Sequence, residues 1–298
     1  MSAVRNLFGA AAAVLLAGCT MTAPPAAAPP LGMYGTDANL TPSKPDRVLR
    51  YADHPRGVAD LRLPEGTGPF PLAMIFHGGC WKTGIADRRY MEPLATRWQQ
   101  LGIATLNVDY REVGDGGGWP GSFGDWSDAE GLLRGLAEDP RLDLSRLTFV
   151  GHSAGALPAQ WLAAAQGVDG PLGNRPATSG ASAIVFDGPA DLALDQPPFD
   201  ALCQFSAVAP FMGGSEREVP QRYRAISPLN HPARLDRILF VQARLPAPNE
   251  RGLAALRSAG AKVAVELKPA ATHFDIITPG AAAYDAVEPQ VLAVLRAQ

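Results

Sequence analysis

The most constraining feature of this chain is a short glycine-serine-glycine turn that lies between a strand pattern and a helix pattern. An apolar run, Leu147–Val150, leads into Gly151–Gly155 (GHSAG), and a helix-forming stretch, Ala156–Gln166, follows. G-x-S-x-G in this context is typical of a strained turn that lifts the hydroxyl of Ser153 above the edge of a sheet. Glycines fit on either side because the helix and the neighbouring strands leave no room for β-carbons. The start of the helix would direct amide N–H groups at any negative charge that forms beside the serine.

A second glycine-rich turn occurs earlier in the chain. His77–Trp81 (HGGCW) follows the buried strand pattern of Leu72–Phe76. Glycines let this backbone turn its amides inward and let a substrate carbonyl approach closely. A loop of this type, placed after a strand, supplies N–H groups to an oxyanion. We therefore expect the amides of Gly79, Cys80 and Ala154 to bind that charge, and removal of one such donor typically costs about 3 kcal/mol of transition-state stabilisation.

Together with these two turns, three further segments resemble the esterase and lipase group of the α/β-hydrolase superfamily that has an HGGxW loop. They are Asn107–Arg111, which ends in DYR, Ser227-Pro228, and Thr272–Asp275, which reads THFD. The resemblance runs from about Arg47 to the C-terminus and includes feruloyl-esterase-like, hormone-sensitive-lipase-like and kynurenine-formamidase-like proteins. It implies an α/β-hydrolase fold, a mostly parallel eight-stranded sheet with helices on both faces and a small lid. It also implies a serine esterase.

The pattern of apolar residues points to the same architecture. After an antiparallel pair of strands within Arg47–Leu63, strand-like and helix-like segments alternate, which predicts a mostly parallel sheet covered on both faces. Catalytic groups then belong at the carboxyl ends of the strands. The further strands are expected at Leu72–Phe76, Ile103–Asp109, Leu147–Val150, Ala183–Phe186, Ile238–Gln242 and Val263–Leu267. Helices are expected at Arg88–Leu101, Asp125–Glu138, Ser153–Gln166, Glu250–Ala259 and Ala281–Arg296.

One long segment, Leu192–Leu229, breaks this alternation and is rich in proline and phenylalanine. We expect it to form a small lid over the active site, because apolar lids shape ligand pockets. Trp81 and Trp119 are candidates to line the same pocket. Ordinary packing of a long crossover is the alternative for each aromatic residue.

The five histidines of the chain leave one good candidate for a catalytic base. His77 and His152 belong to the two turns, His54 lies near the first strands, and His231 precedes the strand at residues 238–242. His273 lies after the last strand, where the α/β-hydrolase order of serine, acid and histidine places the base. We expect His273 to accept the proton of the serine and return it to the leaving group.

The orienting acid is where the sequence departs from the resemblance. Relatives have an aspartate after the strand that corresponds to Ile238–Gln242, but Ala243–Glu250 holds no aspartate. Glu250 is the carboxylate in that segment, and it is also a residue expected to open the next helix. Asp187, at the end of the strand Ala183–Phe186, is the first candidate and Glu250 the second. Absence of the acid is a third alternative, and it can cost about 10⁴ in rate without abolishing catalysis.

The N-terminus predicts export and lipidation. Arg5 precedes an apolar run, Leu7–Ala17, whose eleven residues are too few for a membrane-spanning helix of about 20 but suit a signal peptide. The run ends in Leu16–Cys19 (LAGC), which looks like a bacterial lipobox, although a general signal-peptidase site is the competing reading. We expect residues 1–18 to be removed and Cys19 to be lipidated, which would tether the protein to a bilayer. Because Thr20 follows the cysteine, we expect the protein at the outer membrane, facing the periplasm.

Downstream of Cys19, residues 19–45 form a tether rich in proline and alanine, and residues 46–298 form the catalytic domain. Two further cysteines, Cys80 and Cys203, would lie in a compartment where disulfides persist. A bridge between them would clamp the lid to the oxyanion loop. Two buried thiols are the alternative.

Charge and motifs exclude several other classes of function. A formal net charge of −3 without a basic cluster gives no reason to expect a nucleic-acid partner. The sequence has no motif for a metal ion or a cofactor. The expected partner is a small-molecule ester, and the sequence does not indicate an oligomeric state. Two alternatives stay open: an amide hydrolase resembling kynurenine formamidase, and a degenerate hydrolase that acts as an envelope binding protein.

Overall fold

The computed structural model describes residues 40–164, 169–170, 173–174, 181–227 and 235–297. The signal peptide, Cys19 and most of the tether lie outside the described residues, as do Pro228 and His231. None of the helices within the described ranges combines the length and the apolar character needed to cross a membrane.

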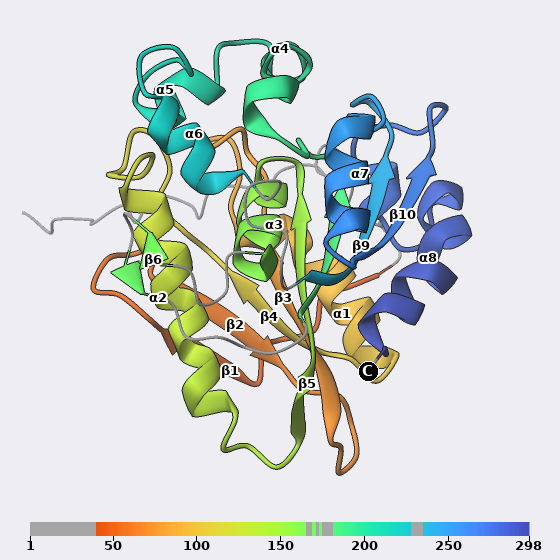
Figure 1. The fold of residues 1–298 in the computed structure, drawn as a ribbon. Helices are drawn as coiled ribbons and strands as arrows, with labels where there is room; N and C mark the ends of the chain where they lie inside the picture. The colour runs from red at the N-terminus through yellow and green to blue at the C-terminus, as the bar shows by residue number, and fades with distance from the viewer. Residues whose placement is uncertain (1–39, 165–168, 171–172, 175–180, 228–234, 298) are drawn as a thin grey trace, which may run out of the picture. The chain divides into compact units, whose positions relative to one another are not determined.

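The expected mostly parallel sheet of eight strands is confirmed (Figure 1). Strands β3, β4, β5, β8, β9 and β10 pair in parallel, whereas β1 and β2 form an antiparallel pair whose second strand joins β4. The strand order is β1 (Arg47–Arg50), β2 (Val58–Arg62), β4 (Ala104–Val108), β3 (Phe70–Phe76), β5 (Leu142–His152), β8 (Ala181–Phe186), β9 (Leu235–Gln242) and β10 (Lys262–Leu267). A separate two-stranded sheet pairs β6 (Asp169–Gly170) with β7 (Gly173–Asn174).

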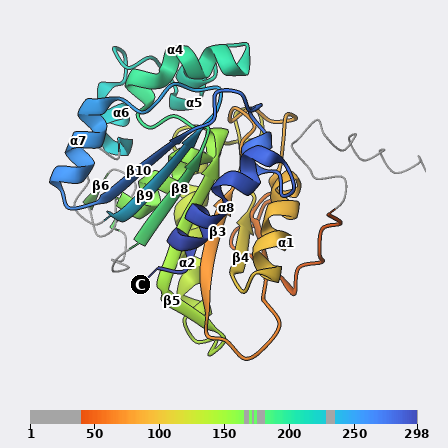
Figure 2. The ribbon, with the colours of Figure 1, turned by 90° about the vertical axis from the view of Figure 1, so that its right-hand side faces the viewer.

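Both faces of the sheet are covered, so the central strand β3 is apolar along its whole length. In β3, Met74 and Phe76 belong to the hydrophobic core on one face, and Ala73 and Ile75 belong to the core on the other. This alternation follows from the two-residue period of a strand. The first face packs against α2 (Gly121–Leu136), α3 (Ala156–Ala164) and α7 (Glu250–Ser258). The second face packs against α1 (Glu92–Gln100) and α8 (Ala282–Leu295), which lie on the side of the sheet turned toward the viewer in Figure 2.

The expected lid segment folds as a cap of three short helices: α4 (Leu192–Cys203), α5 (Val208–Met212) and α6 (Pro220–Ile226). They lie beyond the carboxyl ends of the parallel strands (Figure 1). The helix pattern is hidden in the sequence because α4 contains Pro197 and Pro198 and because the other two helices have only two turns or fewer. We refer to residues 192–227 as the cap; its action as a lid stays a prediction.

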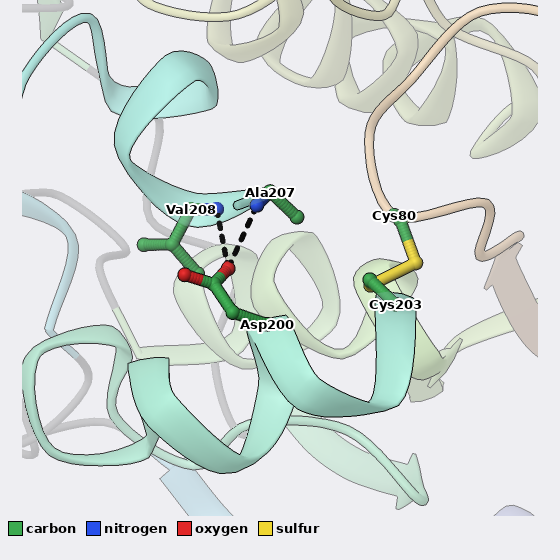
Figure 3. Close-up of a disulfide and its surroundings, with 5 residues drawn as sticks. All are labelled: Cys80, Asp200, Cys203, Ala207 and Val208. Carbon is green, nitrogen blue, oxygen red and sulfur yellow. Dashed lines mark hydrogen bonds between the residues drawn. A yellow bond between two sulfur atoms is a disulfide. The ribbon is translucent and has the colours of Figure 1, made fainter. Parts of the chain in front are cut away.

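Side-chain carboxylates bind the first amides of α4 and α5. Asp191 accepts hydrogen bonds from the amides of Ala193 and Leu194 and so caps α4. The carboxylate of Asp200 accepts the amide hydrogens of Ala207 and Val208, at 2.7 and 3.0 Å, and joins α4 to α5 (Figure 3). Aspartate suits both positions because the first amides of a helix have no partner within the helix.

Candidate active site

The G-x-S-x-G turn has the strained geometry that its sequence predicts. Ser153 adopts a φ of 56°, in the left-handed region, and it lies between the end of β5 and the start of α3. A β-carbon on Gly151 would lie 1.9 Å from the carbonyl oxygen of Gly155, and one on Gly155 would lie 2.1 Å from that of Phe76. Neither position tolerates any other residue without movement of the backbone. The serine itself is 3% exposed.

The HGGCW loop lies directly against this turn. A β-carbon on Gly78 would come within 2.8 Å of the β-carbon of Ser153, so the close approach requires glycine there. Beyond it, Gly79 has a φ of 115°, and Cys80 and Trp81 have φ values of 53° and 52°. Two successive non-glycine residues in the left-handed region are costly and must be held by their surroundings.

Three backbone amides of this region, those expected to bind an oxyanion, lack a hydrogen-bond acceptor in the part of the chain that the structure describes. Among the hydrogen bonds between described residues, none has the amide of Gly79, Cys80 or Ala154 as its donor. Ala154 lies in η2 (Ser153–Gly155), a single 3-10 turn whose first amides have no partner within the turn. The amide of Gly78, by contrast, donates to the hydroxyl of Tyr90.

His77 supports the loop from beneath. Its Nε2 lies 3.2 Å from Oδ1 of Asp109, and its ring stacks on that of Tyr110 with centroids 4.2 Å apart. The hydroxyl of Tyr110 donates to the carbonyl of His77 at 2.6 Å. Burial acts to raise the pKa of Asp109, but the hydrogen bond from His77 and the charges of Arg56 and Arg88 outweigh it and lower the pKa to about 2. The DYR segment therefore holds the glycine loop in place.

The structure brings Asp187 and His273 together. Nδ1 of His273 lies 2.8 Å from Oδ2 of Asp187, whose side chain is fully buried. A carboxylate can only accept, so Nδ1 carries the proton and Nε2 is the nitrogen left to accept one. The carboxylate also accepts the amide hydrogens of Ala243, Arg244 and Leu245, at 2.8 to 2.9 Å. Burial acts to raise the pKa of Asp187, but these hydrogen bonds outweigh it, and the pKa falls below its usual value.

Glu250, the second candidate for the acid, does not reach this site. It is the first residue of α7, its side chain is 78% exposed, and its carboxylate pairs with Arg257 at 2.9 Å. Asn249 caps the helix by accepting the amide hydrogen of Arg251. The segment after β9, where relatives are expected to have an aspartate, contributes backbone amides to Asp187 instead.

His273 lies close to the nucleophile turn. Its ring centroid is 4.4 Å from that of His152, the residue that precedes Ser153. The turn that carries it is closed by a reciprocal pair of hydrogen bonds, from the amide of Thr272 to Asp275 and from the amide of Asp275 to the hydroxyl of Thr272. The site thus gathers residues that follow β3, β5, β8 and β10.

A disulfide joins the HGGCW loop to the cap. Cys80 is bonded to Cys203, the last residue of α4 (Figure 3). The neighbouring Trp81 is fully buried, with its ring 4.4 Å from that of Phe211 and 4.9 Å from that of Phe199. The expectation that Trp81 lines a pocket is therefore wrong: its ring packs within the core of the cap, because the left-handed backbone at Cys80 and Trp81 turns it there.

The sequence did not single out Tyr90, and it placed His152 only within its turn. Both are buried beside the loops described above and are hydrogen-bonded to each other. The only signal in the sequence was the position of His152 within the GHSAG turn. Within the described ranges, no group of three or more His, Cys, Asp or Glu side chains is arranged to hold a metal ion.

Comparisons with known proteins agree with this fold. The sequence model of the BD-FAE family matches residues 59–241. No curated protein matches the chain.

Several solved structures share the fold at low sequence identity. A bifunctional GH43-CE protein of Bacteroides eggerthii has a TM-score of 0.62 and 18% identity, and the match covers 83% of this chain and 37% of that one. A truncated carbohydrate esterase from gut microbiota has a TM-score of 0.67 and 19% identity, with 88% and 100% covered. Esterase 2 of Thermogutta terrifontis, phosphoramylated by tabun, has a TM-score of 0.63 and 17% identity, with 84% and 93% covered.

The fold is thereby the α/β-hydrolase fold, as the sequence predicted. Because the family match spans most of the sheet and both glycine turns, the chain belongs to the BD-FAE family of α/β-hydrolase esterases.

Proposed function

We propose that the protein hydrolyses carboxylic esters through an acyl-serine intermediate. Ser153 is the nucleophile, His273 the general base and acid, and Asp187 the carboxylate that orients the histidine. The observation that supports this most strongly is the 2.8 Å contact between His273 and the buried, amide-solvated Asp187, made beside a serine held at a φ of 56°. Such a constellation is recognised by geometry and by the roles of its members.

In the proposed reaction, Oγ of Ser153 forms a bond to the ester carbonyl carbon while its proton passes to Nε2 of His273. The carbonyl oxygen becomes an oxyanion, which accepts hydrogen bonds from the amides of Gly79, Cys80 and Ala154. As the oxyanion collapses, the bond to the alcohol breaks and the proton moves from Nε2 to the leaving oxygen. Water then repeats the sequence on the acyl-serine, which releases the acid and restores both residues.

The substrate proposed here is an ester of a small molecule or of a carbohydrate. Support comes from the family match and from the carbohydrate esterase whose whole length the fold covers. Acetylated xylan oligomers, methyl ferulate and p-nitrophenyl esters form a suitable panel. N-formylkynurenine belongs in it as well, because a higher rate on this amide would make the protein a formamidase.

A fluorophosphonate probe tests the nucleophile directly. The full chain should become labelled and turn over p-nitrophenyl acetate, whereas Ser153→Ala should do neither while it keeps the wild-type melting temperature. Tabun modification of the Thermogutta esterase shows that an organophosphorus reagent can react with a protein of this fold. If the folded wild type is neither labelled nor active, the enzyme proposal fails and an envelope binding protein becomes the better reading.

We also propose that Cys19 anchors the protein to the outer membrane. The lipobox-like sequence Leu16–Cys19 supports this placement. Cells that express the full chain should incorporate labelled palmitate into the wild type and not into Cys19→Ala. A wild-type protein that is cleaved elsewhere and carries no lipid would contradict the anchor.

A further inference from the structure

A buried chain of hydrogen bonds connects the HGGCW loop with the loop that carries His273. The amide of Gly78 donates to the hydroxyl of Tyr90, in η1 (Arg88–Met91). The hydroxyl oxygen lies 3.0 Å from Nδ1 of His152, and Nε2 of His152 lies 2.9 Å from the carbonyl oxygen of His273. Three hydrogen bonds thus join two loops that are almost two hundred residues apart in the sequence.

The chemistry of the end groups determines the direction of every bond. A backbone carbonyl only accepts, so Nε2 of His152 must carry a proton. In a neutral imidazole Nδ1 is then an acceptor, and it receives the hydroxyl proton of Tyr90. The oxygen of Tyr90 in turn accepts the amide hydrogen of Gly78. One tautomer of neutral His152 satisfies all the groups.

His152 stays neutral because of its surroundings. It is fully buried, and burial, together with the charge of the adjacent His273, lowers its pKa to about 3. The bond to the carbonyl of His273 and the charge of Asp187 act in the opposite direction and are outweighed. The ring of His152 lies 4.4 Å from that of His273. Because it is neutral, it does not repel His273 when that residue becomes positively charged during the proposed reaction.

The chain of bonds also passes directly beside the nucleophile. A β-carbon on Gly78 would lie 2.7 Å from the hydroxyl of Tyr90 and 2.8 Å from the β-carbon of Ser153. Phe274 closes the group from the far side, with its ring 5.4 Å from that of His152 and 6.3 Å from that of Tyr90. The hydrogen bonds therefore fix the backbone of one loop at Gly78, next to the proposed donor Gly79, and that of the other loop at His273 itself.

We propose that Tyr90 and His152 are positioning residues for the hydrolytic reaction. His152 fixes the backbone of His273, Tyr90 fixes the backbone of Gly78, and the bond between them sets the distance between the proton-transferring ring and the oxyanion amides. Neither residue touches substrate. This inference rests on the proposed function, because it assigns no reaction of its own.

Such residues affect the transition state more than the bound substrate. Misplacement of a catalytic group by about 1 Å can lower the rate by about 10²-fold. Loss of a positioning bond is therefore expected to lower kcat and leave KM nearly unchanged, because an interaction needed only in the transition state is removed.

The test compares four variants of the full chain on p-nitrophenyl acetate: Tyr90→Phe, His152→Leu, His152→Gln and Tyr284→Phe. Tyr90→Phe and His152→Leu should lower kcat at least tenfold with KM within twofold, and should slow fluorophosphonate labelling to a similar extent. The side-chain amide of glutamine has an N–H at a reach similar to that of Nε2. The kcat of His152→Gln should therefore be at least threefold higher than that of His152→Leu. Tyr284→Phe is the matched control: Tyr284 is a buried tyrosine of α8 whose hydroxyl accepts a hydrogen bond from Trp98.

Expected support is a loss of kcat in the first two variants that exceeds any loss in the control, when all are assayed well below their melting temperatures. The proposal is overturned if Tyr90→Phe and His152→Leu keep kcat within twofold of wild type, or if Tyr284→Phe loses as much as they do. Equal losses in His152→Leu and His152→Gln would also remove the role of the Nε2 hydrogen bond. A wild type without labelling or turnover contradicts the proposed function itself, and so the two failures are distinguishable.

Discussion

At the level of single residues, the surroundings of Asp187 explain how a buried carboxylate at the end of β8 stays ionised beside His273. Asp187 directly follows β8, and its backbone has a φ of 43°. The segment after β9 wraps around it and donates three amide hydrogens. A buried anion needs such donors to remain ionised. A carboxylate at the end of β8 thus reaches Nδ1 of His273.

Asp187→Asn should lower kcat on p-nitrophenyl acetate by about 10³- to 10⁴-fold, because an amide can hold His273 in the wrong tautomer. Its side chain is close to the same size, so circular dichroism and the melting temperature should show a folded protein. Glu250→Gln is the matched control and should keep kcat within twofold. Equal activity of Asp187→Asn and wild type would exclude Asp187 as the orienting acid.

Gly79 offers a second prediction for a single residue. Its φ of 115° is one that residues other than glycine rarely adopt. A β-carbon there would lie 3.0 Å from Oε1 of Glu112 and 3.1 Å from Cβ of Ala86. Gly79→Ala should rotate the peptide whose amide is the proposed oxyanion donor and lower kcat by about 10²- to 10³-fold, the loss typical of one such donor. Gly84→Ala is the control, since Gly84 also has a positive φ, of 83°, but nothing lies near its β-carbon position. Similar kcat values for the two variants would argue against Gly79 as a donor.

At the level of elements, the cap stabilises the strained part of the HGGCW loop. The left-handed residues Cys80 and Trp81 are both held by the cap, one through the disulfide to Cys203 and the other through ring contacts with Phe199 and Phe211. Strained backbone persists only where its surroundings fix it. If Gly79 and Cys80 donate to the oxyanion as proposed, the cap should support catalysis through the geometry of these amides, in addition to any action as a lid.

Cys203→Ala tests this contribution without changing a residue of the loop itself. The disulfide closes a sequence separation of 123 residues, and its loss should lower the free energy of unfolding by about 2–4 kcal/mol. The variant should also have a lower kcat, because the HGGCW loop loses one of its two attachments to the cap. Dithiothreitol should reproduce both effects in the wild type and add nothing to the variant. Unchanged kcat in the fully reduced wild type would show that the contacts of Trp81 alone are enough to hold the loop.

Most of the strands and helices could be predicted from the sequence, but fewer of the contacts between them could. The strands of the sheet could be located because they are apolar runs bounded by turns, and Ser153 and His273 followed from motif and position. The helices of the cap could not, because Pro197 and Pro198 break the pattern that helices usually show. The choice between Asp187 and Glu250 depends on how the segment after β9 folds, and that folding is fixed by hydrogen bonds to Asp187 itself.

At the level of the whole molecule, two buried groups give the stability opposite dependences on pH. The pKa of His152 is lowered to about 3 in the folded protein, mainly by burial, so the unfolded chain binds a proton that the folded protein does not. Stability is then lost as the pH falls from about 6.5 toward 3, by at most about 1.4 kcal/mol per pH unit. His152→Gln cannot take up this proton. Its melting temperature should fall less steeply than that of wild type over this range, and parallel curves would contradict the assignment.

Glu112 acts in the opposite direction. Its side chain is fully buried, and burial raises its pKa to about 9, although Nη2 of Arg56 lies 3.0 Å from Oε2 and opposes the shift. The charges of Asp115 and Asp109 also raise this pKa. The folded protein therefore keeps a proton that the unfolded chain releases above about pH 4.5, and stability is lost as the pH rises from there to 9, by at most about 1.4 kcal/mol per pH unit.

Glu112→Gln replaces this carboxyl with a neutral group of the same size and has no proton to lose. Between pH 6.5 and 9 its melting temperature should fall less than that of wild type. Differential scanning calorimetry of both proteins in buffers of equal ionic strength measures the two slopes. Glu250→Gln, whose carboxyl lies in solvent, should follow the wild-type curve. A Glu112→Gln curve that runs parallel to wild type would mean that the carboxyl is ionised in the fold and paired with Arg56.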